Sequence, residues 1–194
     1  MKIETTKQTL LESARKLFAQ LGLKDTTMND IAAESHKGRR TVYTYFKSKN
    51  EILDAIIEEE LQFIIHSMKQ VMKMDMEPLD KFKKFVVTRM DAVKTAVKRN
   101  GSLHAEFFRD VFRVELVRRK LEKIELDFLK NILQEGIDKN IFNIDNINQT
   151  SVFIHYMLRG LDVPYIRGLI DICDMSQEDM LNRRVNIMIQ GLLK

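Results

Sequence analysis

Apolar residues recur at helical spacing along the chain, and polar or glycine-containing breaks separate the recurring segments. In the first segment the apolar positions lie three or four residues apart, at Leu10, Ala14, Leu17, Phe18 and Leu21. This spacing places them on one face of a helix with about 3.6 residues per turn. Thr5-x-x-Gln8 is a capping box at the start of the segment, and Gly22 is the residue type that most often ends a helix. The pattern predicts a first helix over about residues 5–22.

Three more helices are predicted before residue 75. Thr27 and Ser48 are each followed three residues later by an acid, and such capping boxes begin helices. They predict a short second helix after Thr27 and a long fourth helix from Ser48 to about Met74. Gly38 can cap a third helix over about residues 39–46. Helices separated by only three or four residues, as the second and third are, form the helix-turn-helix arrangement.

The remainder of the chain carries the same helical period and predicts five further helices. They are expected from Pro78 to near Asn100, around residues 103–111, from there to near Asn140, from about Asn146 to Pro164, and from Ser176 to the C-terminus. With about nine helices, the fold class is all-α. We expect two domains: a three-helix DNA-binding head, residues 1–50, joined by the long fourth helix to a helical bundle, residues 51–194.

Charge is unevenly placed in a chain whose formal net charge is only +4. Residues 1–50 hold ten Lys or Arg and five Asp or Glu, so the other 144 residues hold 22 and 23. A basic head on a near-neutral body suggests that the head meets a polyanion, although chance fluctuation produces an excess of this size as well. Cys173 is the only cysteine and no apolar run approaches the roughly 20 residues of a membrane span. We therefore expect a cytoplasmic protein with no membrane partner.

The third predicted helix carries the chemistry that DNA recognition requires. In a helix-turn-helix the first residues of the second helix of the pair enter the major groove, and here they are Arg39 and Arg40, with Tyr43 one turn later. The fork of an arginine matches O6 and N7 of guanine, whereas Tyr, Thr and Lys suit phosphate oxygens. Double-stranded DNA is the expected partner. The alternative interpretation is a solvated basic face with one core aromatic.

The same stretch resembles the N-terminal domain of TetR-type transcriptional regulators over about residues 5–55. The resemblance is carried, in order and at the right spacing, by Thr26-Thr27, Ile31-Ala32, Thr41-Val42-Tyr43, Phe46, Ser48-Lys49 and Glu51-Ile52-Leu53. It implies base contacts by Asn29, Arg39 and Arg40, and phosphate contacts by Thr27, Tyr43 and Lys49. We add Lys37, Thr41 and Tyr45 as phosphate contacts by their chemistry and position.

Two residues of the turn depart from the family pattern. His36 stands where the family usually has glycine, and Lys37 where it usually has an apolar residue. Histidine tolerates a left-handed backbone better than most side chains, so the turn is expected to survive. Lys37 is expected to point outward.

Similar proteins use the helical body to hold a small effector and to form a homodimer. Candidate residues for the effector pocket are Phe63, Arg89, Met90, His104, Phe108 and Tyr156, and each of them alone is equally explained as ordinary core or edge. Arg89 interrupts an apolar helix face, and a buried arginine needs a partner, which is either an acidic ligand or the solvent at the edge of the bundle. Candidate residues for the dimer interface are Phe153, Met157, Gly160, Leu161, Met180, Arg184 and Met188.

The sequence carries no complete catalytic or metal-binding motif. His104-Ala-Glu106 matches half of a zinc deaminase signature, but the cysteine half is absent. The four histidines show no metal-ligand spacing, so we expect no enzyme, no metal and no cofactor. The function expected is a ligand-responsive DNA-binding regulator, a repressor by analogy, that binds a palindromic operator as a dimer. The alternative is a helical protein-interaction module that binds no DNA.

Overall fold

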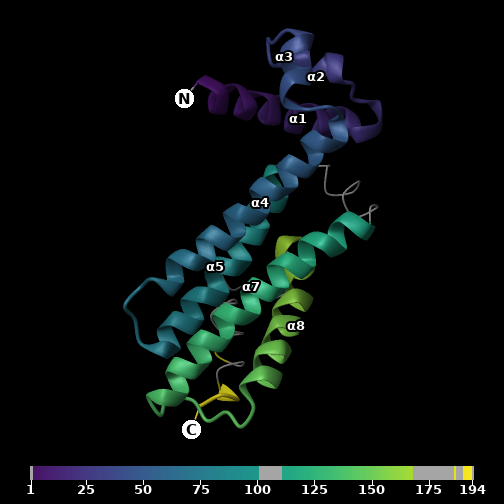
Figure 1. Cartoon of the computed structure of the whole chain (residues 1–194). Coiled ribbons are helices and arrows are strands. Elements are labelled where there is room, and N and C mark those ends of the chain that lie inside the picture. The colour runs from purple at the N-terminus through teal and green to yellow at the C-terminus, as the bar shows by residue number, and fades with distance from the viewer. Residues whose placement is uncertain (1, 101–110, 168–185, 187–189, 194) are drawn as a thin grey trace, which may run out of the picture. The chain divides into compact units, whose positions relative to one another are not determined.

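The computed structural model describes residues 2–100, 111–167, 186 and 190–193, and its described part is helical throughout apart from short connections (Figure 1). The helices are α1 Lys2–Asp25, α2 Met28–Glu34, α3 Arg39–Tyr45, α4 Lys49–Met72, α5 Pro78–Arg99, α7 Val111–Asp138 and α8 Ile147–Ile166. The all-α prediction is confirmed. The expected short helix around residues 103–111 falls almost entirely outside the described residues, and so do His104 and Phe108.

Two compact units divide the chain, and α4, α5 and α7 each contribute residues to both. The first unit comprises Met1–Gln62 and Val97–Arg118, and the second comprises Phe63–Ala96 and Arg119–Lys194. The predicted division into residues 1–50 and 51–194 concerns function and stays a prediction.

In the first unit, α1 to α3 and the start of α4 enclose a single apolar core. Its members are Leu10, Leu11, Ala14, Leu17, Phe18, Ile31, Ala32, Val42, Phe46, Ile52, Leu53 and Ile56. Four of the five positions of the predicted first stripe are therefore buried, whereas Leu21 is 51% exposed. Helix α1 begins at Lys2 rather than near Thr5, and the chain leaves helical geometry at Gly22, with φ 83°. The break occurs where glycine predicted it, but helical turns resume and continue to Asp25.

The turn between α2 and α3 forms as expected despite its unusual residues. Thr27 caps α2 in a complete capping box with Asp30, and Gly38 occupies the N-cap of α3 in an extended conformation. His36 adopts a left-handed backbone with φ 52°. Lys37 N–H donates to Ala32 O at 3.0 Å and so closes the end of α2. The backbone, rather than an apolar side chain at position 37, holds the turn together.

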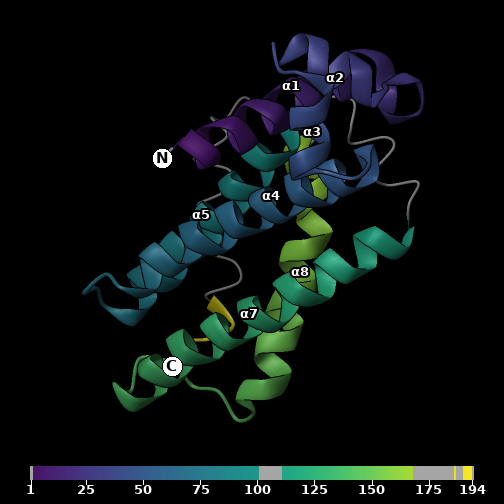
Figure 2. The same cartoon turned by 45° about the horizontal axis from the view of Figure 1, so that its top comes forward.

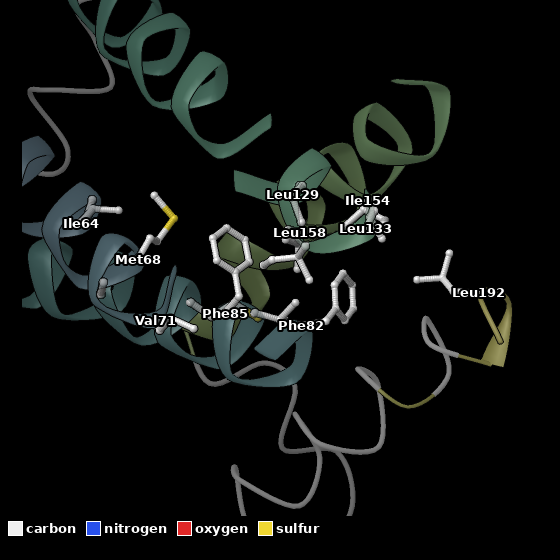
Figure 3. Close-up of a cluster of buried hydrophobic side chains, with 14 of the residues drawn as sticks. Ile64, Met68, Val71, Phe82, Phe85, Leu129, Leu133, Ile154, Leu158 and Leu192 are labelled. Carbon is white, nitrogen blue, oxygen red and sulfur yellow. The ribbon is translucent and has the colours of Figure 1, made fainter. Parts of the chain in front are cut away.

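The second unit is built around buried aromatic and aliphatic side chains from four helices. Phe82 and Phe85 of α5 are fully buried, and Figure 3 shows them among Met68 of α4, Leu129 of α7 and Leu158 of α8. The ring of Phe85 meets that of Phe128 edge to face, with centroids 6.3 Å apart. Pro78 suits the first position of α5 because a helix leaves that N–H without a partner, and the buried side of the helix is apolar apart from Lys81 and Arg89.

The end of the chain corrects one prediction. The last helix was expected to reach the C-terminus, but Gly191 and Leu192 form a turn and Leu193 pairs with Phe142 in an isolated β-bridge. Asn143 N–H donates to Leu192 O at 2.9 Å, and the Leu192 side chain is buried. Burying Leu192 against the α7–α8 connection replaces the last helical turn. Among the described helices, none combines the length and the apolar content needed to cross a bilayer.

Candidate DNA-binding interface

Helices α2 and α3 present most of the predicted DNA-contacting side chains to solvent. The two helices pack against each other beside α1 in the first unit (Figures 1 and 2). Asn29, Arg39 and Arg40 are exposed, and Tyr43 is 44% exposed. The buried side of α3 is fixed by Val42 and Phe46, which are 0% and 3% exposed. The buried anchors therefore determine which side of α3 faces outward.

The first turn of α3 contains an interaction between a cation and an aromatic ring. The guanidinium carbon of Arg39 lies 5.7 Å from the centroid of the Tyr43 ring, within the range of a cation–π contact. Thr44 Oγ1 donates to Arg40 O at 2.9 Å on the exposed side of the helix. Arg39 and Arg40 are adjacent in sequence and so lie about 100° apart around the helix axis. They cannot both face the same base.

The remaining candidates in and around α3 are less accessible. Thr41, Lys37 and Tyr45 are half-buried, and Tyr45 packs against the core of the first unit. The packing of its ring limits the directions in which the hydroxyl of Tyr45 can point.

The start of α2 is held by a reciprocal set of hydrogen bonds. The Thr27 hydroxyl donates to Asp30 Oδ2 at 2.7 Å and accepts from Asp30 N–H at 3.2 Å. Thr27 N–H also donates to Asp30 Oδ2, at 2.8 Å. The side-chain hydrogen bond from Thr27, followed by the backbone one, lowers the pKa of Asp30. Asp30 is therefore ionised at neutral pH, and the hydroxyl of Thr27 has a fixed direction.

Lys49 has two partners within the chain that sequence reasoning missed. Its ammonium donates to Lys24 O at 2.8 Å and to Thr26 O at 2.9 Å, which are carbonyls at the end of α1 and in the α1–α2 connection. The side chain is half-buried there. The sequence could have indicated such acceptors only in general terms, because the last carbonyls of any helix lack hydrogen-bond partners within that helix. No residue type marks those carbonyls in the sequence.

In the second unit, Arg89 meets two carboxylates of the chain itself. Arg89 Nε lies 3.1 Å from Glu125 Oε2, and Arg89 Nη2 donates to Asp162 Oδ2 at 3.0 Å, with a second contact from Nη1 to Oδ1. Arg89 is 2% exposed and Glu125 is fully buried. The acidic partner that a buried arginine requires is thus supplied from α7 and α8. Neither a ligand nor the edge of the bundle is needed to satisfy its charge.

His155 extends this buried network. Its Nδ1 lies 3.1 Å from Glu125 Oε1, while its Nε2 is buried and has no hydrogen-bond partner among the described residues. Burial opposes ionisation of Glu125, but the charge of Arg89 and the bond to His155 outweigh it, so its pKa is lowered. Burial raises the pKa of Asp162 because Arg89 offsets the loss of hydration only in part. Two carboxylates on one guanidinium therefore differ in their readiness to ionise.

The other described effector candidates differ widely in exposure. Met90 is 1% exposed in the core, Phe63 is half-buried against it, and Tyr156 is 52% exposed on α8. Among the residues that the structure describes, no group of three or more His, Cys, Asp or Glu is arranged to hold a metal ion.

Helix α8 exposes part of the predicted dimer face. Phe153 is 66% exposed, Gly160 is exposed, and Met157 and Leu161 are half-buried. Met180, Arg184 and Met188 lie outside the described residues. The dimer interface therefore stays a prediction.

Comparison with known proteins gives consistent matches along the chain. Residues 10–56 match the family described as bacterial regulatory proteins, tetR family. The HTH-type transcriptional regulator YhgD of Bacillus subtilis is 31% identical over 136 residues, which cover 68% of this chain and 69% of YhgD. The HTH-type transcriptional repressor KstR2 of Mycolicibacterium smegmatis is 25% identical over 147 residues, covering 70% and 67%. A transcriptional regulator from Cytophaga hutchinsonii has the same fold, with a TM-score of 0.73, 22% identity, and coverage of 96% and 98%.

Proposed function

The chain belongs to the TetR family of bacterial transcriptional regulators, and from that premise we propose that it represses transcription by binding a palindromic operator as a homodimer. It is a DNA-binding regulator with a helix-turn-helix head. The observation that carries the proposal is the exposure of Arg39, Arg40 and Tyr43 on α3, whose opposite side is fixed in the core. Repression is favoured because KstR2 of Mycolicibacterium smegmatis is named a repressor.

In this proposal α3 enters the major groove with its first turn. At least one of Arg39 and Arg40 reads a guanine through its fork, and Asn29 contacts a further base edge. Tyr43 and Thr27 bind the neighbouring phosphates, and Lys37, Thr41 and Tyr45 add contacts around them. The protein acts in the cytoplasm, where its DNA lies.

A dimer follows from the size of the head, because one helix-turn-helix covers only a half-site. We assign the two-fold contact to the exposed side of α8, around Phe153 and Gly160, together with Met157, Leu161, Met180, Arg184 and Met188. The two reading heads must then lie about 34–36 Å apart on the duplex. A small effector bound within residues 51–194 would release DNA by favouring a dimer with a different spacing.

The proposal is tested by a gel-shift experiment with the DNA upstream of the protein's own gene, at graded salt. We expect a retarded complex whose affinity falls about 10³–10⁵-fold between 50 and 200 mM salt if 6–10 phosphates are neutralised. The matched control is the double variant Arg39→Ala/Arg40→Ala. As salt is raised, its complex with DNA should disappear before that of the unaltered protein. Absence of any complex with this duplex and with mixed-sequence duplexes would leave the protein-interaction module as the function.

A further inference from the structure

An ion cluster joins three helices of the first unit. Arg15 of α1 donates from Nε to Asn100 Oδ1, next to the last residue of α5, at 3.2 Å, and from Nη2 to Glu59 Oε2 of α4 at 2.8 Å. The same Nη2 lies 2.8 Å from Glu60 Oε1, and Arg99 Nη1 lies 3.5 Å from Glu60 Oε2. We call these five residues the Arg15 cluster. It connects α1, α4 and the end of α5.

The centre of the Arg15 cluster is shielded from solvent. The side chains of Arg15 and Glu60 are only 11% and 10% exposed. Glu60 Oε1 accepts no hydrogen bond in the described part of the chain, so the nearby guanidinium stabilises it by charge. Arg15 also lies at the C-terminal end of α5, where the helix dipole favours a cation. Ion pairs with this degree of burial are screened much less by salt than exposed pairs are.

The cluster reaches α5, whereas the apolar core of the first unit does not. The described members of that core come from α1 to α3 and the start of α4. The three helices α1 to α3, which form the reading head, are therefore held to one another by apolar packing. The Arg15 cluster, and not this core, connects the head with the last turn of α5. The position of the head beside α5 thus depends on polar contacts.

We propose that Arg15 is a positioning residue for operator binding, which holds the reading head to the end of α5 and so sets the distance between the two heads of a dimer. The inference rests on the proposed function, in which a homodimer binds a palindromic operator. Two heads bind together only when they match the half-site spacing of about 34–36 Å. A loosely held head still binds a half-site, but the second head then reaches its own half-site at a lower effective concentration.

Two duplexes separate positioning from damage to the head. Full-length Arg15→Met and the unaltered protein are compared on a palindromic duplex, obtained by binding-site selection with the unaltered protein, and on a duplex with one of its half-sites. We expect Arg15→Met to lose about tenfold in affinity for the palindrome and nothing on the half-site. Lys16→Met is the matched control, because the ion pair of Lys16 with Glu34 lies within the head, and it should change neither affinity.

Two results of this comparison would overturn the proposal. Equal losses on both duplexes would mean that Arg15 supports the fold of the head itself, and an unchanged affinity for the palindrome would mean that it positions nothing. Failure of the unaltered protein to bind either duplex would count against the proposed function instead.

The spacing of the half-sites supplies a second readout. One base pair inserted between them moves them about 3.4 Å apart. The unaltered protein should bind the lengthened palindrome more weakly than the selected one. The loss should be smaller for Arg15→Met, because loosely held heads accept more than one spacing. An equal loss for both proteins would contradict the proposal.

A double-mutant cycle tests the route through α5. Asn100→Ala removes the acceptor on the α5 side of the cluster. Its loss on the palindrome should not add to that of Arg15→Met, because both changes break the same connection, whereas the losses of Arg15→Met and Arg40→Ala should add. Additive losses in both cycles would contradict action through α5. If Arg15→Met does not fold, Asn100→Ala takes its place on the two duplexes with the same criteria.

Hydrogen exchange gives a readout that needs no DNA. In Arg15→Met the amides in the last turn of α5 should exchange faster than in the unaltered protein. The α3 amides of Val42 and Phe46, which donate to Gly38 O and Val42 O, should exchange at the same rate in both. Equal acceleration in α3 would indicate a general loss of stability and would overturn positioning.

Discussion

Arg39 lies over the ring of Tyr43 one helical turn later, with 5.7 Å between its guanidinium carbon and the ring centroid. An exposed cation–π contact of this kind contributes about 0.5–1 kcal/mol. It holds Arg39 near the tyrosine that is proposed to bind phosphate, whereas Arg40 points about 100° away around the helix. The two neighbouring arginines therefore face different directions, and only Arg39 is held beside Tyr43.

We predict that Arg40 is the stronger base reader of the two. On an operator duplex obtained by binding-site selection with the unaltered protein, Arg40→Ala should cost about 1–3 kcal/mol of binding free energy and relax the preference at one base pair. Binding-site selection with both variants is the measurement, and Arg39→Ala is the matched comparison. Selection that returns the unaltered consensus from both variants, with undiminished information at every position, would show that neither arginine reads a base.

The buried network around Arg89 predicts a large stability effect. Arg89→Met leaves Glu125 and Asp162 without their shared cation, and breaking a buried pair in this way costs about 3–5 kcal/mol. The free energy of unfolding, measured by urea denaturation, should fall by that amount. Lys139→Ala is the control, because its ion pairs are half-exposed, at 44% exposure for the lysine, and pairs of that kind contribute about 0–1 kcal/mol. Similar losses in the two variants would refute the assignment.

The same network sets a pH dependence with a definite sign. Because the pKa of Glu125 is lower when folded than when unfolded, the unfolded chain binds the proton first as pH falls. The contribution of ionised Glu125 to the free energy of unfolding is present above the unfolded pKa of about 4.3. It is lost as pH falls through the pKa of the folded state. The pKa of Asp162 is raised, so its contribution changes in the opposite direction, and stability falls as pH rises between the unfolded and the folded value.

Unfolding free energies measured from pH 7 to about pH 3 test these two signs. The difference in free energy of unfolding between the unaltered protein and Glu125→Gln should shrink toward acid pH. As pH rises through the raised pKa of Asp162, the free energy of unfolding of Asp162→Asn should increase relative to that of the unaltered protein. Parallel curves for all three proteins would mean that neither carboxylate has a shifted pKa.

Two glycines should respond oppositely to the same substitution. A Cβ on Gly136 would lie 2.0 Å from Cδ2 of Phe142, and Phe142 is buried. Gly136→Ala should therefore destabilise the protein by about 1–3 kcal/mol through overpacking. A Cβ on Gly160 meets no described atom of its own chain within 4 Å, so in the dissociated monomer Gly160→Ala, in a helix interior, should stabilise by about 0.5–1 kcal/mol. Thermal denaturation of both variants measures the contrast, and equal shifts in melting temperature would contradict it.

The exposed side of α8 gives a prediction about assembly. Phe153→Glu places a charge on a side chain that is 66% exposed, so it should leave the fold intact and convert the dimer to a monomer. Sedimentation at micromolar concentration is the measurement. Leu21→Glu, which changes a 51% exposed leucine of α1, is the control and should remain dimeric. An unaltered protein that already sediments as a monomer would disprove the dimer.

Local signals in the sequence predicted the helices well. Thr27, Gly38 and Asn146 each cap the helix that they were expected to begin, because capping depends on residues within one turn. The apolar period located the buried face of α5 for the same reason. The prediction failed at the chain end, where Leu192 is buried next to a segment about 50 residues earlier.

The interactions that define the sites could not be predicted, since they join distant residues. Glu125 and Asp162 are 36 and 73 residues from Arg89, and many other acids were equally eligible partners in the sequence. The acceptors of Lys49 are backbone carbonyls, which every residue has. The apolar face around Arg89 left open whether the side chain is buried with a partner or reaches the edge of the bundle, and it did not identify the partner.

Helix α4 contributes side chains to both apolar cores, and this links the unfolding of one core to that of the other. Its first turns place Ile52 and Ile56 in one core, and its later turns place Met68 and Val71 in the other. Starting a helix is costly and extending it is not, so loss of either core removes the packing that keeps half of this helix ordered. We expect a single cooperative unfolding transition for both units. Mutations deep in the body would then reduce the population of folded heads, and so lower operator occupancy in the cell, without touching any residue near DNA.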